Sequence, residues 1–449
     1  MDAATRLGHP EANDLQNLDA NDKIERYYKY IGPTGRRQDA AHRYLHPKLQ
    51  SGDYPNLHVL VQKQVVRVLF DGKRASGVEY QTNPKFLSNP EFLSTKYTAK
   101  RSVHARKLVV VSAGANATPG ILERSGVGNA KLLEKLGVPV VEDLPGVGED
   151  YQDHHLSLWT YRTDLKPREC INGFMDGRFD IDEAIRNNDE LLGTNGMDAQ
   201  GKFRPTEEEV DALGPGFRKA WDKAFKDFPD KPLMIVALYT AYYGDHSMLP
   251  QDGHEYVSQA NWTGYPFSRG SVHITSPDMH APVDFNTGWL EDEDGNDLLK
   301  HVWAYKLTRE MWRRMAIFRG ELKSNHPRFP EGSEAAVIEN ADGPIVTDDN
   351  SRIKYTKEDD EAIKQRIREM ISTTWHSLGT CKMAPREQTG VVDGNLNVYG
   401  LEGLKLADLS IPPGNVGANT GNTAFVIGEK AADLIVKELG LHRVDSPQL

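Results

Sequence analysis

Cysteine is scarce in this sequence: of 449 residues only Cys170 and Cys381 are cysteine, and they lie far apart. This spacing argues against a disulfide framework and predicts an intracellular, reducing location, cytoplasmic or peroxisomal. The sequence also has no apolar run long enough to cross a bilayer, and its mean hydropathy is −0.58. It opens without a secretory signal and does not end in a Ser-Lys-Leu type of peroxisomal address.

Positive charge is also in deficit, because 54 Lys and Arg face 65 Asp and Glu, which gives a net charge of −11. This balance argues against nucleic acid or an anionic membrane as a partner. Hydrophobic residues make up 38% and charged residues 27%, as in ordinary globular proteins. The length is sufficient for two or three domains with real cores, and we find no internal repeats or low-complexity segments.

Strand patterns begin near residue 56. Residues 57–61 and 65–70 are rich in aliphatic side chains, and Asp71-Gly72 predicts a hairpin turn before a returning strand at 76–80. Residues 83–100 have the composition of a polar insertion. The pattern up to this point predicts three strands, the second and third of which form a hairpin.

An apolar strand at 107–112 is followed at once by a turn containing Gly114, and Thr118-Pro119 begins a helix. The continuous apolar run predicts a strand of a parallel sheet that is buried on both faces. Backbone amides at such a strand–turn–helix junction can meet a phosphate or a flavin, although many α/β proteins turn in this way without binding either. A second helix is expected at 129–136, closed by Gly137.

The middle of the chain, residues 156–385, differs in character. A strand is expected at 156–159, charged helices at 172–228, an aromatic strand at 233–243 and a long helix at 300–322. Thr356 and Asp359 are spaced as a capping box for a further helix. This mixture predicts a separate antiparallel sheet covered by helices.

Asp153-His154-His155 suggests a metal site only at first sight. Neighbouring side chains point in different directions on a strand or helix, and no other cluster of histidine and cysteine supports the idea. We therefore expect no metal.

The carboxyl-terminal block, residues 374–440, concentrates chemistry. His376 lies between a tryptophan and a Ser-Leu-Gly-Thr-Cys turn, and a histidine can take a hydroxyl proton near neutral pH. Asn419 can orient the same oxygen. Asp408 ends an apolar strand, where its carboxylate either accepts bonds from a cofactor's hydroxyls or caps a turn. Asn419 and Thr420 open the final helix, 424–439, whose free N–H groups can face an electron-rich flavin edge.

At this point the sequence resembles the glucose-methanol-choline (GMC) flavoprotein oxidoreductases, and within them the fungal and yeast alcohol (methanol) oxidases. The resemblance spans nearly the whole chain. The motifs that carry it are Gly-Ala-Asn-Ala-Thr-Pro at 114–119 with Ser-Gly-Val-Gly at 125–128, Asp-Leu-Pro-Gly-Val-Gly at 143–148 with Asp-His at 153–154, Tyr-Pro-Phe-Ser-Arg-Gly at 265–270, and Trp-His-Ser-Leu-Gly-Thr-Cys at 375–381.

The resemblance implies FAD as cofactor and a mixed fold, α/β plus α+β. An incomplete Rossmann-like FAD-binding domain is interleaved with an antiparallel-sheet substrate domain covered by helices. The expected parts are a polar amino-terminal segment (1–55), FAD-binding parts (56–155 and 386–449) and a substrate-binding domain (156–385).

The resemblance also implies roles for single residues. His376 and Asn419 fall on the two catalytic positions of the family. Val65, Gly114 and Asp408 fall on positions that contact the cofactor. These matches imply oxidation of short primary alcohols by hydride transfer to flavin, with dioxygen reduced to hydrogen peroxide and a homo-oligomer as the expected assembly.

One family feature is missing: the sequence has no strand followed by a Gly-x-Gly-x-x-Gly turn near its start. Because that turn holds the FAD pyrophosphate, three alternatives stay open beside the oxidase. They are a GMC dehydrogenase with another electron acceptor, a non-catalytic fragment or subunit that needs the missing segment, and an NAD-linked dehydrogenase, which the missing fingerprint disfavours.

Overall fold

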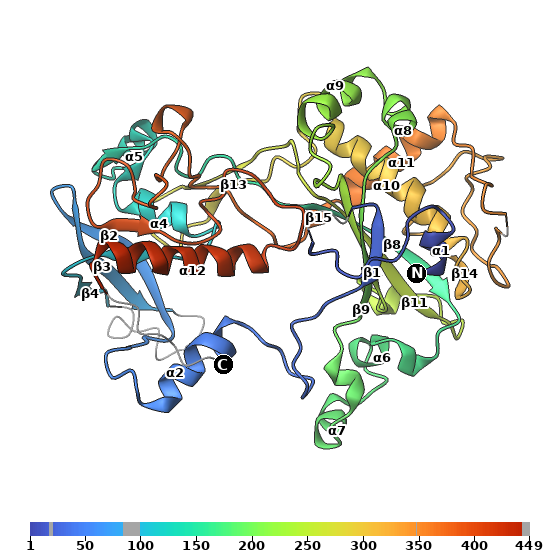
Figure 1. The fold of residues 1–449 in the computed structure, drawn as a ribbon, viewed down its shortest axis with the longest axis horizontal. Helices are drawn as coiled ribbons and strands as arrows, with labels where there is room; N and C mark the ends of the chain where they lie inside the picture. Colours follow the sequence, from blue (N-terminus) through green and yellow to red (C-terminus); the bar gives the residue numbers. More distant parts are fainter. Residues whose placement is uncertain (18–20, 84–98, 347, 442–449) are drawn as a thin grey trace. The chain divides into compact units, whose positions relative to one another are not determined.

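The computed structural model describes residues 1–17, 21–83, 99–346 and 348–441. The chain divides into two compact units (Figure 1). Unit 1 comprises Met1–His46, His154–Phe267 and Leu290–Thr374, and unit 2 comprises Pro47–Asp153, Ser268–Trp289 and Trp375–Leu449. Most of the expected polar insertion, residues 84–98, lies outside the described residues.

The core of unit 1 is an antiparallel sheet whose strands differ in length. Their order is β1-β9-β10-β11-β8-β14, with β15 also paired to β8. The strands at 156–159 and 233–243 are confirmed as β8 and β10. The expectation of helices throughout 172–228 was wrong at β9, whose Asp, Gln and Lys carry no strand signal. The strands are β1 (Lys23–Arg26), β8 (His155–Thr163), β9 (Met197–Phe203), β10 (Met234–Tyr239), β11 (Glu255–Thr263), β14 (Phe318–Glu321) and β15 (Ser372–Thr373).

Helices cover this sheet, and the longest, α10, is buried along most of its length. Trp312 near its end stacks on Tyr161 of β8, with ring centroids 4.3 Å apart and planes 8° apart. The predicted helix 300–322 ends at Trp312, because the chain turns there and returns as β14. The helices of unit 1 are α1 (Asp2–Thr5), α6 (Asn172–Met175), α7 (Ile181–Arg186), α8 (Glu207–Ala212), α9 (Pro215–Ala224), α10 (Asn296–Trp312) and α11 (Lys357–Met370).

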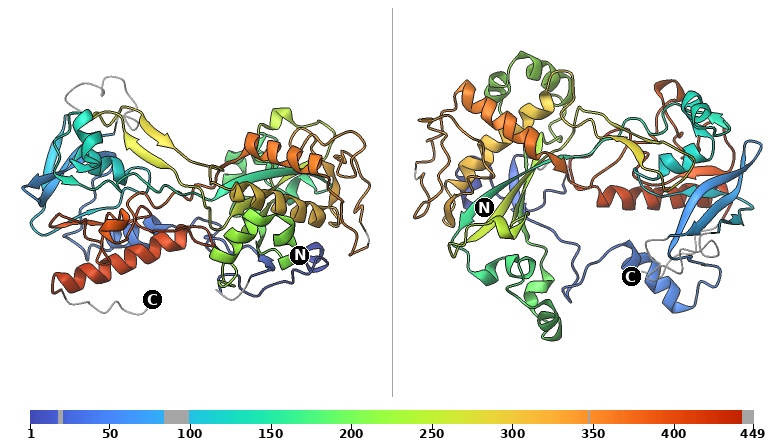
Figure 2. Two further views of the ribbon diagram at one scale, coloured as in Figure 1. Left: turned by 90° about the horizontal axis from the view of Figure 1, so that it is seen from above. Right: turned by 180° about the vertical axis from the view of Figure 1, so that it is seen from behind.

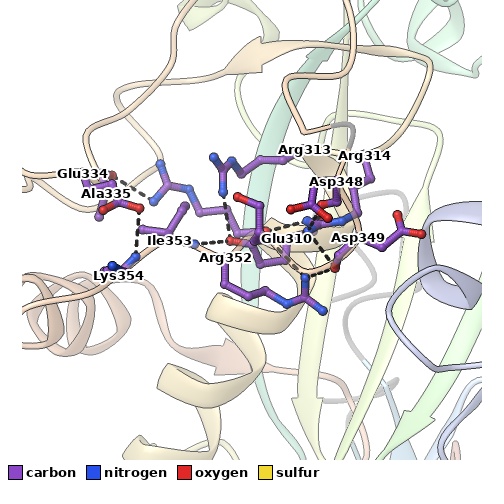
Figure 3. Close-up of polar contacts among 12 residues, drawn as sticks. Glu310, Arg313, Arg314, Glu334, Ala335, Asp348, Asp349, Arg352, Ile353 and Lys354 are labelled. Carbon is purple, nitrogen blue, oxygen red and sulfur yellow. Dashed lines mark hydrogen bonds and ion pairs between the residues drawn. The ribbon is translucent and has the colours of Figure 1, made fainter.

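Charged side chains fix the loop that leads to α11. Glu310 on α10 accepts hydrogen bonds at Oε1 from Arg313 Nη1 and from the backbone N–H of Ile353, both at 2.9 Å (Figure 3). Arg314, on the same helix end, donates to Glu310 Oε2 and to carbonyls of the loop. The predicted capping box is confirmed, with Thr356 Oγ1 accepting from Asp359 N at 3.1 Å.

Unit 2 contains smaller sheets: β2-β3-β4, β12-β13 and two parallel pairs, β16-β5 and β6-β7. The hairpin at Asp71-Gly72 is confirmed as β2–β3. Residues 57–61 form no strand, contrary to expectation. The elements are α2 (His46–Ser51), β2 (Lys63–Asp71), β3 (Arg74–Thr82), β4 (Arg101–His104), β5 (Val109–Val111), α4 (Thr118–Arg124), β6 (Val127–Gly128), α5 (Ala130–Lys135), β7 (Glu142–Asp143), β12 (Ser271–Ile274), β13 (Val283–Asn286), β16 (Leu404–Leu406) and α12 (Gly421–Glu438).

The parallel pair β16-β5 brings residues 404–406 beside residues 109–111, with Leu406 opposite Val111. Val109 and Val111 are buried, but Val110 is 41% exposed, so the expected burial of both strand faces was wrong. The final helix, confirmed as α12, lies at the surface of unit 2 (Figure 2) and has Ala431 as its one buried residue among those described. No helix in the described part of the chain is long and apolar enough to span a membrane.

Candidate active site

Asp408, which follows β16, holds the turn after the neighbouring strand β5. Its Oδ2 accepts from the N–H of Gly114 at 2.9 Å and from Thr118 Oγ1 at 2.6 Å, and its Oδ1 accepts from the N–H of Ser410 at 2.7 Å. Gly114 has φ +83°, which a glycine adopts without strain. The structure therefore brings Gly114 and Asp408 together, in the turn-capping arrangement that was one of the two readings of Asp408.

His376 lies on an irregular segment that buried side chains hold in place. Its N–H donates to Asp153 Oδ1 at 3.0 Å. Tyr151 OH lies 3.3 Å from Asp153 Oδ2 and 3.1 Å from Ser377 Oγ. Trp375 adopts φ +60°, an uncommon conformation for a bulky residue. The hydrogen bond from the N–H of His376 to Asp153 holds the backbone in this conformation.

The environment of His376 keeps its imidazole neutral. Burial lowers the pKa of His376 to about 4. A neutral imidazole at physiological pH has a ring nitrogen that can accept a proton, as a general base must. The neighbouring residue Trp375 is 76% exposed.

The two cysteines are buried within the units. Cys381, in the turn after His376, is fully buried, and burial raises the pKa of its thiol. Cys170 in unit 1 is buried as well, and burial raises the pKa of its thiol to about 12. Neither thiol pairs in a disulfide, and neither has the lowered pKa of a nucleophilic cysteine.

Asn419 and Thr420 stand at the beginning of α12. Asn419 is exposed and Thr420 is buried as the residue that precedes the helix. The Thr420 side chain makes no capping bond, so the first-turn N–H groups of α12 are not satisfied by the usual cap. This end of the helix favours an electron-rich group.

Val65 occupies a different part of unit 2, on β2, where it is partly buried against the core. The strand is attached to α4, since the carbonyl of Val66 accepts from Arg124 Nε at 2.9 Å and the N–H of Val68 donates to Ser125 Oγ at 2.8 Å. Because α4 directly follows the Gly114 turn, this helix connects the strand of Val65 to the turn that Asp408 holds.

The residues present suit a cofactor with a polar edge. A Cβ built on Gly114 would meet nothing within 4 Å, so the backbone there is open to close approach. Asn415 is buried, and its Nδ2 has no hydrogen-bond partner in the part of the chain that the structure describes. Such an orphaned donor calls for a ligand or a water. Among the described residues no group of three His, Cys, Asp or Glu could hold a metal.

The sequence patterns do not single out Gln152, which contacts both the segment of His376 and the turn before Asn419. Its Oε1 accepts from the N–H of Asn415 at 3.1 Å, and its backbone pairs with Leu378. The available signal is position, because Gln152 directly precedes Asp153-His154, which belongs to one of the motifs that carry the family resemblance. Sequence spacing alone does not reveal the hydrogen bond between Gln152 and Asn415, because the two residues are 263 positions apart.

GMC oxidoreductase family models match residues 1–156 and 266–428. Alcohol oxidase 1 of Komagataella phaffii is 38% identical, with 98% of this chain and 71% of that protein covered. The alcohol oxidase of Candida boidinii is 36% identical over the same shares. The chain belongs to the GMC oxidoreductase family.

Solved structures show the same fold. An FAD-dependent oxidoreductase from Chaetomium thermophilum superposes with a TM-score of 0.72 at 24% identity, covering 98% of this chain and 72% of that one. A formate oxidase gives 0.73 at 18% identity, covering 97% of this chain and 70% of that one. The predicted fold class and family are thereby confirmed.

Proposed function

We propose that this protein is an FAD-dependent oxidase of short primary alcohols. The alcohol loses a hydroxyl proton and a hydride to become an aldehyde, and dioxygen takes up the two electrons and two protons as hydrogen peroxide. The cofactor supplies the hydride acceptor. The observation that carries the proposal is the placement of His376: its N–H is held by Asp153, and its segment is joined through Gln152 to the turn before Asn419. Burial also lowers the pKa of its imidazole.

The residues of this chain prepare the alcohol for that reaction. His376 accepts the hydroxyl proton as the C–H bond breaks, which requires the neutral imidazole that burial favours. Asn419 can donate to and accept from the same oxygen, and it orients the alcohol and stabilises the developing alkoxide. Asp408 keeps the Gly114 turn open for the cofactor through its two bonds to Gly114 and Thr118.

The relatives support the substrate class. The curated relatives at 36% to 38% identity are alcohol oxidases. A more distant relative, at 29% identity, is an oxygen-dependent choline dehydrogenase of Cronobacter sakazakii. We propose short primary alcohols and dioxygen as the substrates. We also propose a homo-oligomeric state and a cytoplasmic or peroxisomal location for this protein.

Flavin absorbance tests the proposal directly. The purified chain is mixed with FAD, and methanol is added without oxygen. We expect the band of oxidised flavin to disappear, and readmitted oxygen to restore it with formation of peroxide. Reduction by methanol followed by reoxidation only with a dye would establish a dehydrogenase instead.

A second sample separates activity from cofactor retention. The chain is fused to a strand–Gly-x-Gly-x-x-Gly–helix segment of the kind that the sequence lacks. Flavin bound by the fusion and not by the chain alone would establish the fragment hypothesis. A fusion that binds flavin but is not reduced by any short alcohol contradicts the proposed function.

A further inference from the structure

Gln152 connects the two segments that carry His376 and Asn419. It is 2% exposed and lies in unit 2, as both segments do. We propose that Gln152 is a positioning residue that sets the His376 segment and the Asn419 turn relative to each other. This inference rests on the proposed function, in which these two side chains act on one oxygen.

On one side, Gln152 is paired with the His376 segment through its backbone. Its N–H donates to the carbonyl of Leu378 at 3.0 Å, and its carbonyl accepts from the N–H of Leu378 at 2.9 Å. The flanking residues reinforce the pairing: Asp153 receives the N–H of His376, and Tyr151 OH contacts Ser377. Three consecutive residues thus hold the His376 segment.

On the other side, the amide of Gln152 holds the turn before Asn419. Its Oε1 accepts from the N–H of Asn415 at 3.1 Å, and its Nε2 lies 3.4 Å from the carbonyl of Pro413, to which it donates. Asn415 lies four residues before Asn419. A single carboxamide therefore accepts and donates within one turn, which neither a carboxylate nor an apolar side chain can do.

A glycine makes room for this amide. Gly379, in the His376 segment, has φ +93°, and a Cβ there would lie 3.1 Å from Gln152 Nε2 and 2.8 Å from the carbonyl of Asp150. The N–H of Gly379 also donates to the carbonyl of Leu409, just after Asp408. The His376 segment, the Asp408 strand end and the Asn419 turn consequently meet around Gln152, which positions a general base and an oxygen-orienting amide together.

The test compares two buried glutamines. Gln152→Met keeps size and removes both side-chain bonds. The matched control is Gln259→Met in β11 of unit 1, where the Gln259 amide bonds Ala237, Ala260, Asn261 and Trp312. Hydrogen–deuterium exchange is followed in peptides that cover residues 374–383 and 410–420. We expect exchange in both peptides to accelerate about tenfold in Gln152→Met and in neither peptide in Gln259→Met.

A kinetic measurement gives the second readout. In flavin-loaded protein, Gln152→Met is expected to slow flavin reduction at saturating alcohol about tenfold or more, with little change in KM, because positioning is lost and substrate contacts remain. Gln152→Glu keeps the acceptor for Asn415 N–H and is expected to rescue part of the exchange protection in 410–420. If Gln152→Met does not fold, Gln152→Glu replaces it in both the exchange and the kinetic measurements.

The outcomes separate this inference from the proposed function. Unchanged exchange at 410–420 in Gln152→Met overturns the positioning role, whatever the activity. Accelerated exchange with unchanged flavin reduction also overturns it, because the connection would then be structural only. If wild-type protein oxidises no alcohol, the proposed function fails, and the exchange comparison still decides whether Gln152 couples the two segments.

Discussion

Unit 1 and unit 2 differ in how they are held together. In unit 1 regular elements dominate: the strands pair in one sheet, and Tyr305 of α10 and Ile367 of α11 are buried in one cluster with Trp159 of β8. In unit 2 the site is formed by turns whose positions depend on side chain to backbone bonds, those of Asp408, Asp153 and Gln152. Side-chain packing therefore holds the elements of unit 1 together, whereas single hydrogen bonds position the candidate-site residues of unit 2.

This difference teaches where mutations will act. A change in unit 1 should alter stability before activity, because its buried charges and rings support the sheet. A change to a polar side chain in the turns of unit 2 should alter activity before stability, because it removes single hydrogen bonds and leaves the apolar core of the unit in place. Four substitutions and conditions test this separation, from the largest expected effect to the smallest.

The largest effect is expected at the buried pair Arg309–Glu321. Both side chains are fully buried, and the guanidinium binds the carboxylate through Nε at 2.6 Å and Nη2 at 2.8 Å. Arg309→Met leaves Glu321 charged and unpaired, so it should lower the free energy of unfolding by about 3–5 kcal/mol. Urea unfolding measures the loss. Lys323→Met, which breaks an exposed pair with Glu339, should cost less than about 1 kcal/mol.

His376→Ala should lower activity far more than stability, the reverse of what is expected for Arg309→Met. Without the base, flavin reduction by methanol is expected to slow by roughly 10²-fold or more, which stopped-flow absorbance measures. The free energy of unfolding should fall much less than in Arg309→Met. His254→Ala, at a partly buried histidine of unit 1, is the control and should reduce flavin at the wild-type rate. A wild-type rate in His376→Ala would remove that residue from the site.

Acid should destabilise unit 1 through His326. Its Nε2–H donates to the carbonyl of Thr160 at 3.0 Å, and its Nδ1 accepts from Tyr305 OH at 3.1 Å. Burial lowers the pKa of His326 from the ordinary value for histidine, about 6.5, to about 4. The unfolded chain therefore binds the proton first, and stability present above pH 6.5 is lost as the pH falls towards 4, by about 2 kcal/mol between pH 7 and 5.

His326→Gln tests this assignment by urea unfolding at both pH values. Removal of the titrating ring should shrink the difference between pH 7 and pH 5 by about 2 kcal/mol. His42→Gln, at an exposed histidine, should leave the difference as it is in the wild type. Equal differences in wild type and His326→Gln would show that other groups cause the acid sensitivity.

The smallest effect is expected on α12. Val426 is 66% exposed, so Val426→Ala should change the free energy of unfolding by no more than about 0.5 kcal/mol. Leu122→Ala, at a fully buried residue of α4 in the same unit, should cost about 2–5 kcal/mol. A large effect of Val426→Ala would show that this face of α12 is covered in solution.

Local patterns predicted local structure well. Asp71-Gly72 placed the β2–β3 hairpin, Thr356 and Asp359 placed the start of α11, and Gly137 placed the end of α5. These signals act within a few residues, through turn geometry, capping bonds and a positive φ. The same kind of pattern failed at 57–61, since an aliphatic run becomes a strand only where a partner strand is available.

The candidate site was predictable by residue type but not by arrangement. His376, Asn419 and Asp408 were identified from the sequence, and the contact between Asp408 and Gly114 spans 294 positions that no spacing rule connects. The bonds from Gln152 to Asn415 and from His376 to Asp153 are similarly remote. Such contacts depend on which strands become neighbours, and that choice is made by the packing of the whole unit.

The burial of both thiols has a consequence for the product of the proposed reaction. Hydrogen peroxide attacks thiolates, and a thiol that is enclosed and kept protonated reacts slowly. Cys170 and Cys381 meet both conditions. The folded protein should therefore tolerate the oxidant that the proposed reaction would release, and a thiol-specific reagent should label it only after denaturation.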